Sequence, residues 1–252
     1  MKKITAIIPT FNEEHNIIAA IKSVDFADEI IVVDSFSSDK TIKLATPLVD
    51  KVLQREYENS ASQKNWVIPK AKYEWIFILD ADERLCENIR KEIISILKYD
   101  TTYDGFWIKR KNYFMDKRVY FSGWREDKVI RLFRRDRCRY ENKYVHAEIF
   151  SDGKIGFLKN KIIHNTFRSK HEYLKKIERY AKWQAKDYDR RTGKITFFHT
   201  IIKPIFRFIK HYIVQLGILD GYVGLIIANY QARAVSMRYK FLKDLRNEKR
   251  NN

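Results

Sequence analysis

The stretch that decides the fold is WIFILDADERL, residues 75–85, in which a short apolar run ends on two aspartates. Such a run is typical of a parallel strand that is buried on both faces. Asp80 and Asp82 stand two residues apart, so their carboxylates repel each other unless a cation neutralises them. Hard oxygen ligands suit Mg²⁺ or Mn²⁺. The stretch therefore predicts a buried strand that ends at a metal site, with a helix cap as the alternative role for the carboxylates.

Apolar runs and helical patterns alternate through the first hundred residues. The runs lie at residues 4–10, 28–35, 51–56 and 75–80, and the helical patterns between and after them begin near Asn12, Ser38, Ser60 and Cys86. We expect Asn12 to be an N-cap and Pro69 to end or kink the third helix. The alternation predicts a parallel α/β sheet with crossover connections. Because ligands bind beyond the carboxyl ends of such strands, Thr10 and Asp34 are expected beside the aspartate pair.

The pattern changes after residue 100. Strand-like stretches follow at residues 105–114, 128–135 and 147–158, and a helical, basic segment begins near Ser169. We place a domain boundary near residue 167. The hydrophobic content of 45% is high enough to exclude general disorder.

Charge is unevenly distributed along the chain. The net charge is +18, yet residues 1–100 carry 14 Lys+Arg against 17 Asp+Glu, and the remainder carries 36 against 15. The asymmetry predicts an anionic partner for the later part, either nucleic acid or a membrane surface. Cys86 and Cys138 have no metal-type or disulfide spacing, which favours a reducing compartment. The first residues lack the apolar core of a signal peptide, so this part is expected to be cytoplasmic.

The basic tail contains an amphipathic helical pattern. Its apolar stripe consists of Ile202, Ile205, Phe206, Ile209, Tyr212, Ile213 and Leu216, and the opposite face carries Lys203, Arg207 and Lys210. This composition predicts a helix that lies in an anionic membrane interface, and a helix packed on the catalytic domain is the alternative. In residues 211–232 Asp220 is the only formal charge, so we expect a hairpin or shallow insertion rather than a crossing.

Four segments carry a resemblance to a known family. IIPTFNEEHNI, EIIVVDSFSSDKT, SQKNWVIPKA and WIFILDADERL follow one another as in family 2 glycosyltransferases with the GT-A fold. RLFRR, KPIFRFIKHY and LDGYVGL further resemble the bacterial enzymes that add a sugar to the lipopolysaccharide inner core. The resemblance implies an α/β, Rossmann-like and mostly parallel sheet flanked by helices. It also implies a catalytic domain over 1–167, with a nucleotide-sugar half at about 1–100 and an acceptor half at about 101–167. Residues 168–252 would form a helical, membrane-associating extension.

The resemblance also implies roles for single residues. Asp80-Ala81-Asp82 matches the D-x-D motif that holds a divalent ion against the donor diphosphate, with Asp82 as the direct ligand. The remaining matches to donor-binding positions are Pro9, Thr10 and Glu13 in the first nucleotide-binding loop, Asp34 at the base, Gln63, Lys64 and Asn65 on the following helix, and Arg131 at a phosphate. Glu83 and Arg84 belong either to the site or only to the following turn.

The proton acceptor and a third metal ligand come from the later segments. An inverting transfer needs one carboxylate base, and Asp127 is our choice, with Glu126 as the fallback. His146 and His164 are both candidates for the third ligand, with His146 preferred, and a structural role is the alternative for each. In the related enzymes an acidic residue directly follows the histidine. In this chain Ala147 follows His146, and the acidic residue, Glu148, comes one position later.

These observations together predict an enzyme. We expect a hexose, glucose in the first instance, to move from a UDP-linked donor to a lipid-linked acceptor such as the lipopolysaccharide inner core. The reaction would use Mg²⁺ or Mn²⁺ at an anionic membrane surface, on the cytoplasmic face of the inner membrane. Synthesis of capsule or another surface polysaccharide is the alternative. A nucleic-acid-binding protein and a non-catalytic membrane scaffold are the competing classes, and we expect no nucleic-acid partner. The sequence does not predict the oligomeric state.

Overall fold

The computed structural model describes residues 1–141, 148–167 and 169–251. The chain forms two compact units. The first consists of Met1–Lys111 and Lys128–His164, and the second of Asn112–Asp127 and Asn165–Asn252.

The first unit is built on a sheet whose first four strands are parallel. They are β1 (Ile4–Thr10), β2 (Glu29–Asp34), β3 (Lys51–Gln54) and β4 (Trp75–Ile78). Within the sheet these four strands stand in the order β3-β2-β1-β4. The chain therefore builds outward from β1 through β2 to β3, and then returns to place β4 on the other side of β1. This reversal makes the carboxyl ends of β1 and β4 the switch point where ligands bind in such sheets.

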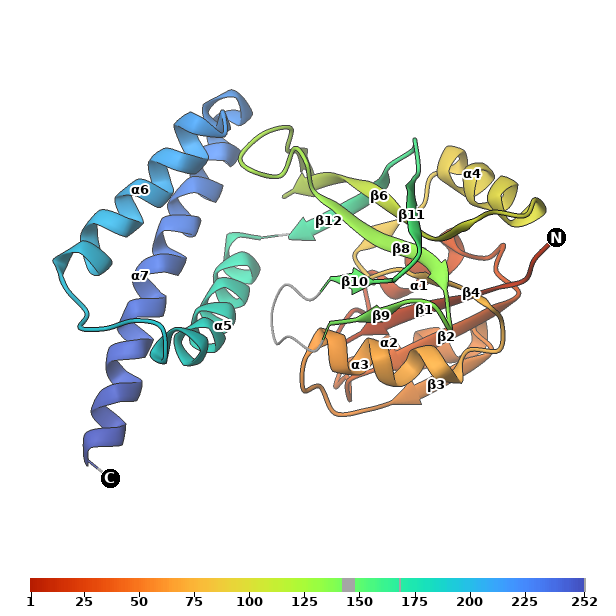
Figure 1. Ribbon diagram of the computed structural model, residues 1–252, viewed down its shortest axis with the longest axis horizontal. Coiled ribbons are helices and arrows are strands. Elements are labelled where there is room, and N and C mark those ends of the chain that lie inside the picture. Colours follow the sequence, from red (N-terminus) through yellow and green to blue (C-terminus); the bar gives the residue numbers. More distant parts are fainter. Residues whose placement is uncertain (142–147, 168, 252) are drawn as a thin grey trace. The chain divides into compact units, whose positions relative to one another are not determined.

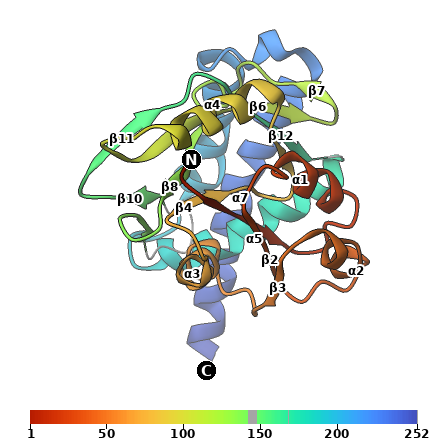
Figure 2. The same ribbon diagram turned by 90° about the vertical axis from the view of Figure 1, so that its right-hand side faces the viewer.

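Helices cover both faces of these strands. On one face lie α1 (Ile17–Ser23), α2 (Thr41–Ala45) and α4 (Glu87–Lys98), and on the other lies α3 (Ser60–Val67). In Figure 2, α3 lies on the side of the strands opposite α1 and α4. α4 shows why the sequence folds this way, because Ile89, Ile93 and Leu97 recur every four residues and are all buried. Strand residues alternate between the two cores, with Ile8 in one and Ile7 in the other.

The remaining strands of the first unit pair around this frame. They are β5 (Glu83–Arg84), β6 (Tyr103–Phe114), β8 (Lys128–Arg134), β9 (Arg139–Tyr140), β10 (Ile149–Phe150), β11 (Lys154–Phe157) and β12 (Ile162–Phe167). The last residues of β6 and β12 belong to the second unit. The sheet continues from β4 in the order β8-β6-β12-β5, β11 pairs with β6, and β9 and β10 form a separate two-stranded sheet. β8 runs antiparallel to both β4 and β6, and β5 pairs with β12. Short 3₁₀ turns at Thr46–Leu48 and Ile68–Lys70 extend α2 and α3. Pro69 lies in the second of these turns, so it ends the α-helix, as predicted.

The second unit is largely helical (Figure 1). It contains the short strand β7 (Lys117–Arg118) and the helices α5 (Lys170–Asp189) and α7 (Gly221–Asn251). Between these two helices lies the continuous helix Phe198–Val214, which has α6 (Lys203–Ile209) at its centre and π-helical ends at Phe198–Ile202 and Lys210–Val214. The 3₁₀ turn Gly217–Asp220 connects this helix to α7. Phe114, Tyr173 and Ile227 are buried in a common core. Among the described residues no one helix has the length and hydropathy of a membrane span, although the bent pair Phe198–Val214 and Gly217–Lys249 passes that test jointly, with a 71° bend.

The predicted fold class is confirmed, and one predicted helix start is wrong. α1 begins at Ile17 rather than near Asn12, which has a positive φ of 54°. Its side chain accepts a hydrogen bond from the backbone of Ser38 (2.8 Å), so it connects two loops instead of capping a helix. The left-handed conformation is one that asparagine tolerates better than most residues.

Candidate active site

The loops after β1 and β2 are joined by hydrogen bonds between side chains and backbone. The backbone amide of Asn12 donates to Ser37 Oγ and that of Glu13 to Thr41 Oγ1, both at 2.8 Å. Asp34, fully buried at the end of β2, accepts from the amide of Ser37 (2.8 Å). The predicted base-binding carboxylate is thus engaged in the turn that follows its own strand.

Thr10, the last residue of β1, presents an unsatisfied hydroxyl. Its Oγ1 is buried and has no hydrogen-bond partner among the described residues, and Pro9 beside it is half-buried. An unmet buried hydroxyl is destabilising by about 1–3 kcal/mol unless a ligand or water satisfies it. Its place at the switch point makes it a suitable contact for a bound polar ligand.

α3 directs two of its three predicted residues toward the strand ends. Gln63 is buried and donates to Ser35 Oγ (2.7 Å), directly after β2. Lys64 Nζ lies 3.2 Å from Asp80 Oδ1. Asn65 points elsewhere, because its amide exchanges hydrogen bonds with the backbone of Tyr140 at 2.9 and 3.0 Å. Asn65 therefore holds β9 against α3 in this structure.

The first aspartate of the D-x-D motif is surrounded by cations. Asp80 pairs with Arg131 as well as Lys64, and Arg110 lies close enough to act on it electrostatically. Burial alone would raise the pKa of Asp80, but the charges of Arg131, Lys64 and Arg110 outweigh it and hold that pKa far below the usual range. Burial likewise opposes the charge on Arg131, yet Asp80 and Glu83 raise its pKa above the ordinary value. Asp80 thus stays ionised at every physiological pH.

Glu83 completes this buried charge network. Its carboxylate is fully buried, and it accepts from Arg131 Nη2 (2.8 Å), from the amide of Asp80 (3.1 Å) and from Arg110 Nη1 (3.4 Å). A buried carboxylate needs such partners, because an unpaired charge inside a protein is strongly destabilising. Glu83 thus fixes the turn that carries Asp80.

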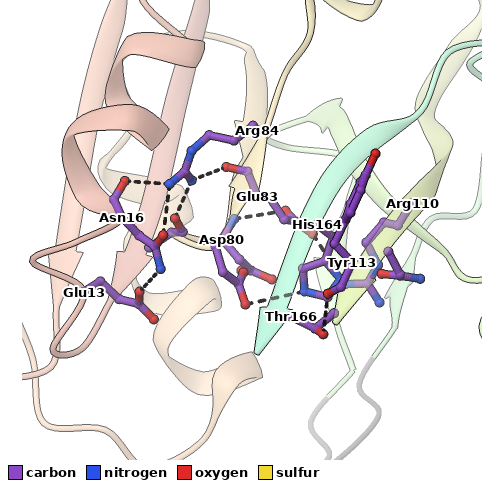
Figure 3. A network of polar contacts seen from close by, with 12 residues as sticks. Glu13, Asn16, Asp80, Glu83, Arg84, Arg110, Tyr113, His164 and Thr166 are labelled. Atoms are coloured by element: carbon purple, nitrogen blue, oxygen red, sulfur yellow. Dashed lines mark hydrogen bonds and ion pairs between the residues drawn. The ribbon is translucent and has the colours of Figure 1, made fainter. Parts of the chain in front are cut away.

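Arg84 supports the same turn from the other side (Figure 3). Its guanidinium donates to the carbonyl of Ala81 (2.6 Å) and, through Nη2, to the carbonyl and side-chain oxygens of Asn16 (2.9 and 3.1 Å). Asn16 in turn donates to Glu13 Oε2 (2.6 Å). The chain of contacts links Glu13 to the backbone between the two aspartates, so Glu13 helps to order this turn.

The second aspartate meets a histidine rather than the cation cluster. Asp82 Oδ2 lies 3.5 Å from His164 Nε2, on β12, and both side chains are largely buried. The described residues hold no ready-made cluster of three or more metal ligands, and His146 lies outside the described residues. A carboxylate beside an imidazole fits a divalent ion whose other ligands are substrate phosphates and water. The role of Asp82 as the direct metal ligand stays a prediction.

Comparison with known proteins establishes the family. Residues 5–209 match the family described as Glycosyl transferase family 2. The chain belongs to this family. It is 24% identical to the lipopolysaccharide core biosynthesis glycosyltransferase LpsC of Rhizobium meliloti, over 94% of this chain and 93% of that protein. It is 28% identical to an uncharacterised glycosyltransferase of Rickettsia typhi, over 100% and 90% of the two chains. The structure of S. aureus TarS 1–349 in complex with UDP is similar with a TM-score of 0.47 and 15% identity, over 98% and 92% of the chains.

The predicted bases of this glycosyltransferase belong to the second unit. Asp127 Oδ2 accepts from the side chain of Asn112 (2.9 Å), and Asn112 is buried. Asp127 is half-buried, whereas Glu126 is exposed. Asp127 is therefore the more buried of the two carboxylates, and its role as base stays a prediction.

Sequence reasoning missed several residues of the glycosyltransferase site. Arg110 stands in the run KRK, where nothing distinguishes it from its neighbours, and Asn16 stands in an ordinary helix start. Glu83 was left open between a site role and a turn role, and the structure gives it contacts to both Asp80 and Arg131. Its position directly after the D-x-D motif was the feature of the sequence that could have indicated a role in the site.

Proposed function

We propose that this glycosyltransferase moves a hexose from a UDP-linked donor to a lipid-linked saccharide with inversion at the anomeric carbon. The observation that carries the proposal is the D-x-D turn at the switch point, with Asp80 neutralised by buried cations and Asp82 facing His164. Family membership supplies the reaction class, and glucose is the hexose we expect.

Asp82 and His164 would hold the divalent cation, Mg²⁺ or Mn²⁺. When bound, the cation would offset the negative charge that develops on the departing diphosphate. Asp80 has a positioning role, because its ion pairs with Arg131 and Lys64 fix the turn that carries Asp82. Lys64 and Arg131 also give the site positive charge next to the place of the donor phosphates.

The donor's nucleoside is held at the ends of β1 and β2. The unsatisfied hydroxyl of Thr10 and the buried amide of Gln63 offer hydrogen bonds there, and Asp34 is the carboxylate that the resemblance assigns to the base. Two rigid strands and a helix carry these groups, which favours precise positioning of the donor.

Asp127 takes the proton from the acceptor hydroxyl. The hydroxyl oxygen forms a bond to the anomeric carbon as the bond from that carbon to the UDP oxygen breaks, and the electron pair leaves with UDP. The hydroxyl proton passes to Asp127, whose other contact, with Asn112, orients the carboxylate. A single displacement of this kind needs one base and no covalent intermediate.

The lipopolysaccharide inner core is the acceptor we favour, at the cytoplasmic face of the inner membrane. The match to LpsC along nearly the whole of both chains supports this choice. Capsule or another surface polysaccharide would use the same site chemistry, so the two acceptors are distinguished by assay and not by the residues described above.

The test is donor hydrolysis and binding by the full chain across UDP-sugars, with Mn²⁺, with Mg²⁺ and with EDTA. We expect selection of one UDP-hexose that depends on the metal, and a loss of roughly 10²–10³-fold in Asp82→Asn. Asp25→Asn is the matched control, because it removes a carboxylate that lies exposed in the same unit. Failure of every UDP-sugar to bind under all metal conditions would refute the proposal. Lipid-linked inner-core and capsule saccharides, offered with the selected donor, then identify the acceptor.

A further inference from the structure

An unusually apolar surface covers one segment of the second unit. Fourteen large hydrophobic side chains within residues 197–225 are exposed. They are Phe197, Phe198, Ile201, Ile202, Ile205, Phe206, Ile209, Ile213, Val214, Leu216, Ile218, Leu219, Tyr222 and Leu225. Single exposed hydrophobic residues are normal, but a contiguous group of this size marks an interaction site. We refer to these residues as the apolar ridge.

The helix Phe198–Val214 has its polar side turned toward the protein. Lys203 Nζ donates to Tyr239 Oη on α7 (2.8 Å), and the buried ring of His211 contacts the carbonyl of Ser122 through Nδ1 (3.1 Å). Ile205 and Phe206 point outward and are 52% and 65% exposed. A helix on a water-exposed surface has the opposite arrangement. The stripe predicted from the sequence is therefore real, and it is not buried against the rest of the chain.

The charge of the segment favours one class of partner. Residues 190–219 contain six Lys or Arg and no Asp or Glu. Arg190, Arg191 and Lys194 are exposed just before the apolar ridge, and Lys210 is exposed within it. Cations beside an apolar face attract anionic lipid headgroups. A second copy of the chain would instead bring the exposed cations of one copy against those of the other.

Asp220, the only acidic residue between residues 190 and 225, is engaged by the protein. Its carboxylate accepts from the amides of Tyr120 and Phe121 (2.9 and 3.0 Å) and from Ser122 Oγ (2.7 Å). The charge that argued against a membrane crossing is thus directed into a loop of its own unit.

Two glycines keep the end of the segment compact. A side chain at Gly217 would meet the carbonyl oxygen of His211 at 2.6 Å, and one at Gly224 would meet the carbonyl oxygen of Gly217 at 1.8 Å. The chain can therefore fold back closely from the helix Phe198–Val214 into α7. Ile218 and Leu219, on the connecting turn, extend the apolar ridge at this bend.

We propose that the apolar ridge inserts shallowly into one leaflet of a bilayer rich in anionic lipid. Phe206, Ile205 and Ile209 are the central anchors, and the flanking cations contact phosphate headgroups. Only one side of the helix is apolar, which suits a helix lying in the interface plane rather than one surrounded by hydrocarbon. The inference adds a surface and its partner to the proposed transferase and does not depend on the reaction.

The test is co-sedimentation of the full chain with vesicles that contain no nucleotide sugar and no saccharide. One vesicle set is phosphatidylglycerol with phosphatidylethanolamine, and the other is phosphatidylcholine alone. We expect binding to the anionic set to exceed binding to the neutral set, and the double variant Phe206→Ser/Ile209→Ser to bind at least about tenfold more weakly. Phe157→Ser is the matched control, since Phe157 is 61% exposed in the first unit. Equal melting temperatures show that each variant is folded.

Three outcomes overturn the inference. They are unchanged vesicle binding by the double variant, equal binding to both vesicle sets, and a concentration-dependent dimer without vesicles that the double variant abolishes. Because the assay involves no donor or acceptor, its failure leaves the proposed transfer reaction standing, and failure of the donor assay leaves this inference standing.

Discussion

The D-x-D turn and the helix Phe198–Val214 depart from ordinary burial in opposite directions. At the turn, the charged residues Glu83, Arg131 and Lys64 are buried. On the helix, the apolar side chains are exposed and Lys203 faces inward. Each arrangement is unfavourable in water alone. The difference indicates what each region binds. Buried ionised groups organise a site for a charged ligand, whereas exposed apolar groups are stabilised by contact with an apolar partner such as lipid.

The largest expected effect comes from breaking the buried charge network. Glu83→Gln removes the carboxylate that pairs with Arg131 and Arg110 and leaves their charges only partly compensated. Removing one partner of a buried pair is destabilising by about 3–5 kcal/mol. We expect a loss of this order in the free energy of unfolding, measured by urea denaturation.

An exposed ion pair in the same unit provides the control. Asp25 is 59% exposed and pairs with Arg90 on the surface, so Asp25→Asn is expected to change the free energy of unfolding by about 0–1 kcal/mol. Similar effects for Asp25→Asn and Glu83→Gln would contradict the view that burial gives the network its importance.

The second prediction concerns the metal. His164→Ala removes the imidazole beside Asp82 and is expected to weaken Mn²⁺ binding in the presence of UDP by about tenfold to a hundredfold. Electron paramagnetic resonance of free Mn²⁺ measures this affinity directly. His171→Ala, an exposed histidine on α5, should leave the affinity unchanged. A structural role for His164 would instead lower stability and leave the Mn²⁺ affinity as it was.

The elements that the sequence predicted well have patterns contained within a few residues. β1, β2, β4 and α4 follow from continuous apolar runs or a repeat of about four residues, and the structure places them at the expected positions. The polar strand ends follow from the same runs. Such features depend on neighbouring residues only, so a single sequence suffices.

The features that escaped prediction depend on residues far apart in the chain. Asn12 was wrongly predicted to be an N-cap because its hydrogen-bond partner is Ser38, 26 residues away. Arg131 likewise donates to Glu83, 48 residues away in the chain. The stripe on the helix Phe198–Val214 was predicted correctly, but periodicity cannot say which side faces the protein. That choice depends on α7, which lies later in the chain.

A third prediction compares the helix caps of the two units. The side chains of Asn59 and Ser169 accept from the amides of Ser62 (2.8 Å) and Glu172 (3.2 Å), at the starts of α3 and α5. Replacement of either by alanine should reduce stability by about 1 kcal/mol. Only Asn59→Ala is expected to weaken UDP binding as well, because α3 carries Lys64. Isothermal titration with UDP distinguishes the two, and equal effects on UDP affinity would contradict the separate roles.

The smallest effect is a pH dependence in the second unit. Burial, together with Arg207 and Lys210, lowers the pKa of His211 below its ordinary value of 6.5, although its contact with Ser122 opposes this. Between those two pKa values the unfolded chain takes up a proton that the folded chain does not. Stability is therefore full above about pH 6.5 and falls as the pH drops below it.

His211→Asn removes the titrating group and should reduce the difference in melting temperature between pH 7.5 and 5.5, by on the order of 2 °C. Calorimetry at the two pH values measures the change. His15→Asn, which removes an exposed histidine of the first unit, should leave the difference intact. A loss of pH dependence in both variants would show that general charge, rather than the buried ring, is responsible.

The contacts of Asp220 have a practical consequence for exchanging segments between such enzymes. The segment 112–127, which carries Asp127, is joined through Tyr120 and Phe121 to a carboxylate a hundred residues later in the chain. A chimera cut at residue 167 would separate these partners and leave backbone amides without their acceptor. A graft intended to exchange the second unit of one such enzyme for that of another should therefore transplant residues 112–127 together with 165–252 as a single discontinuous module.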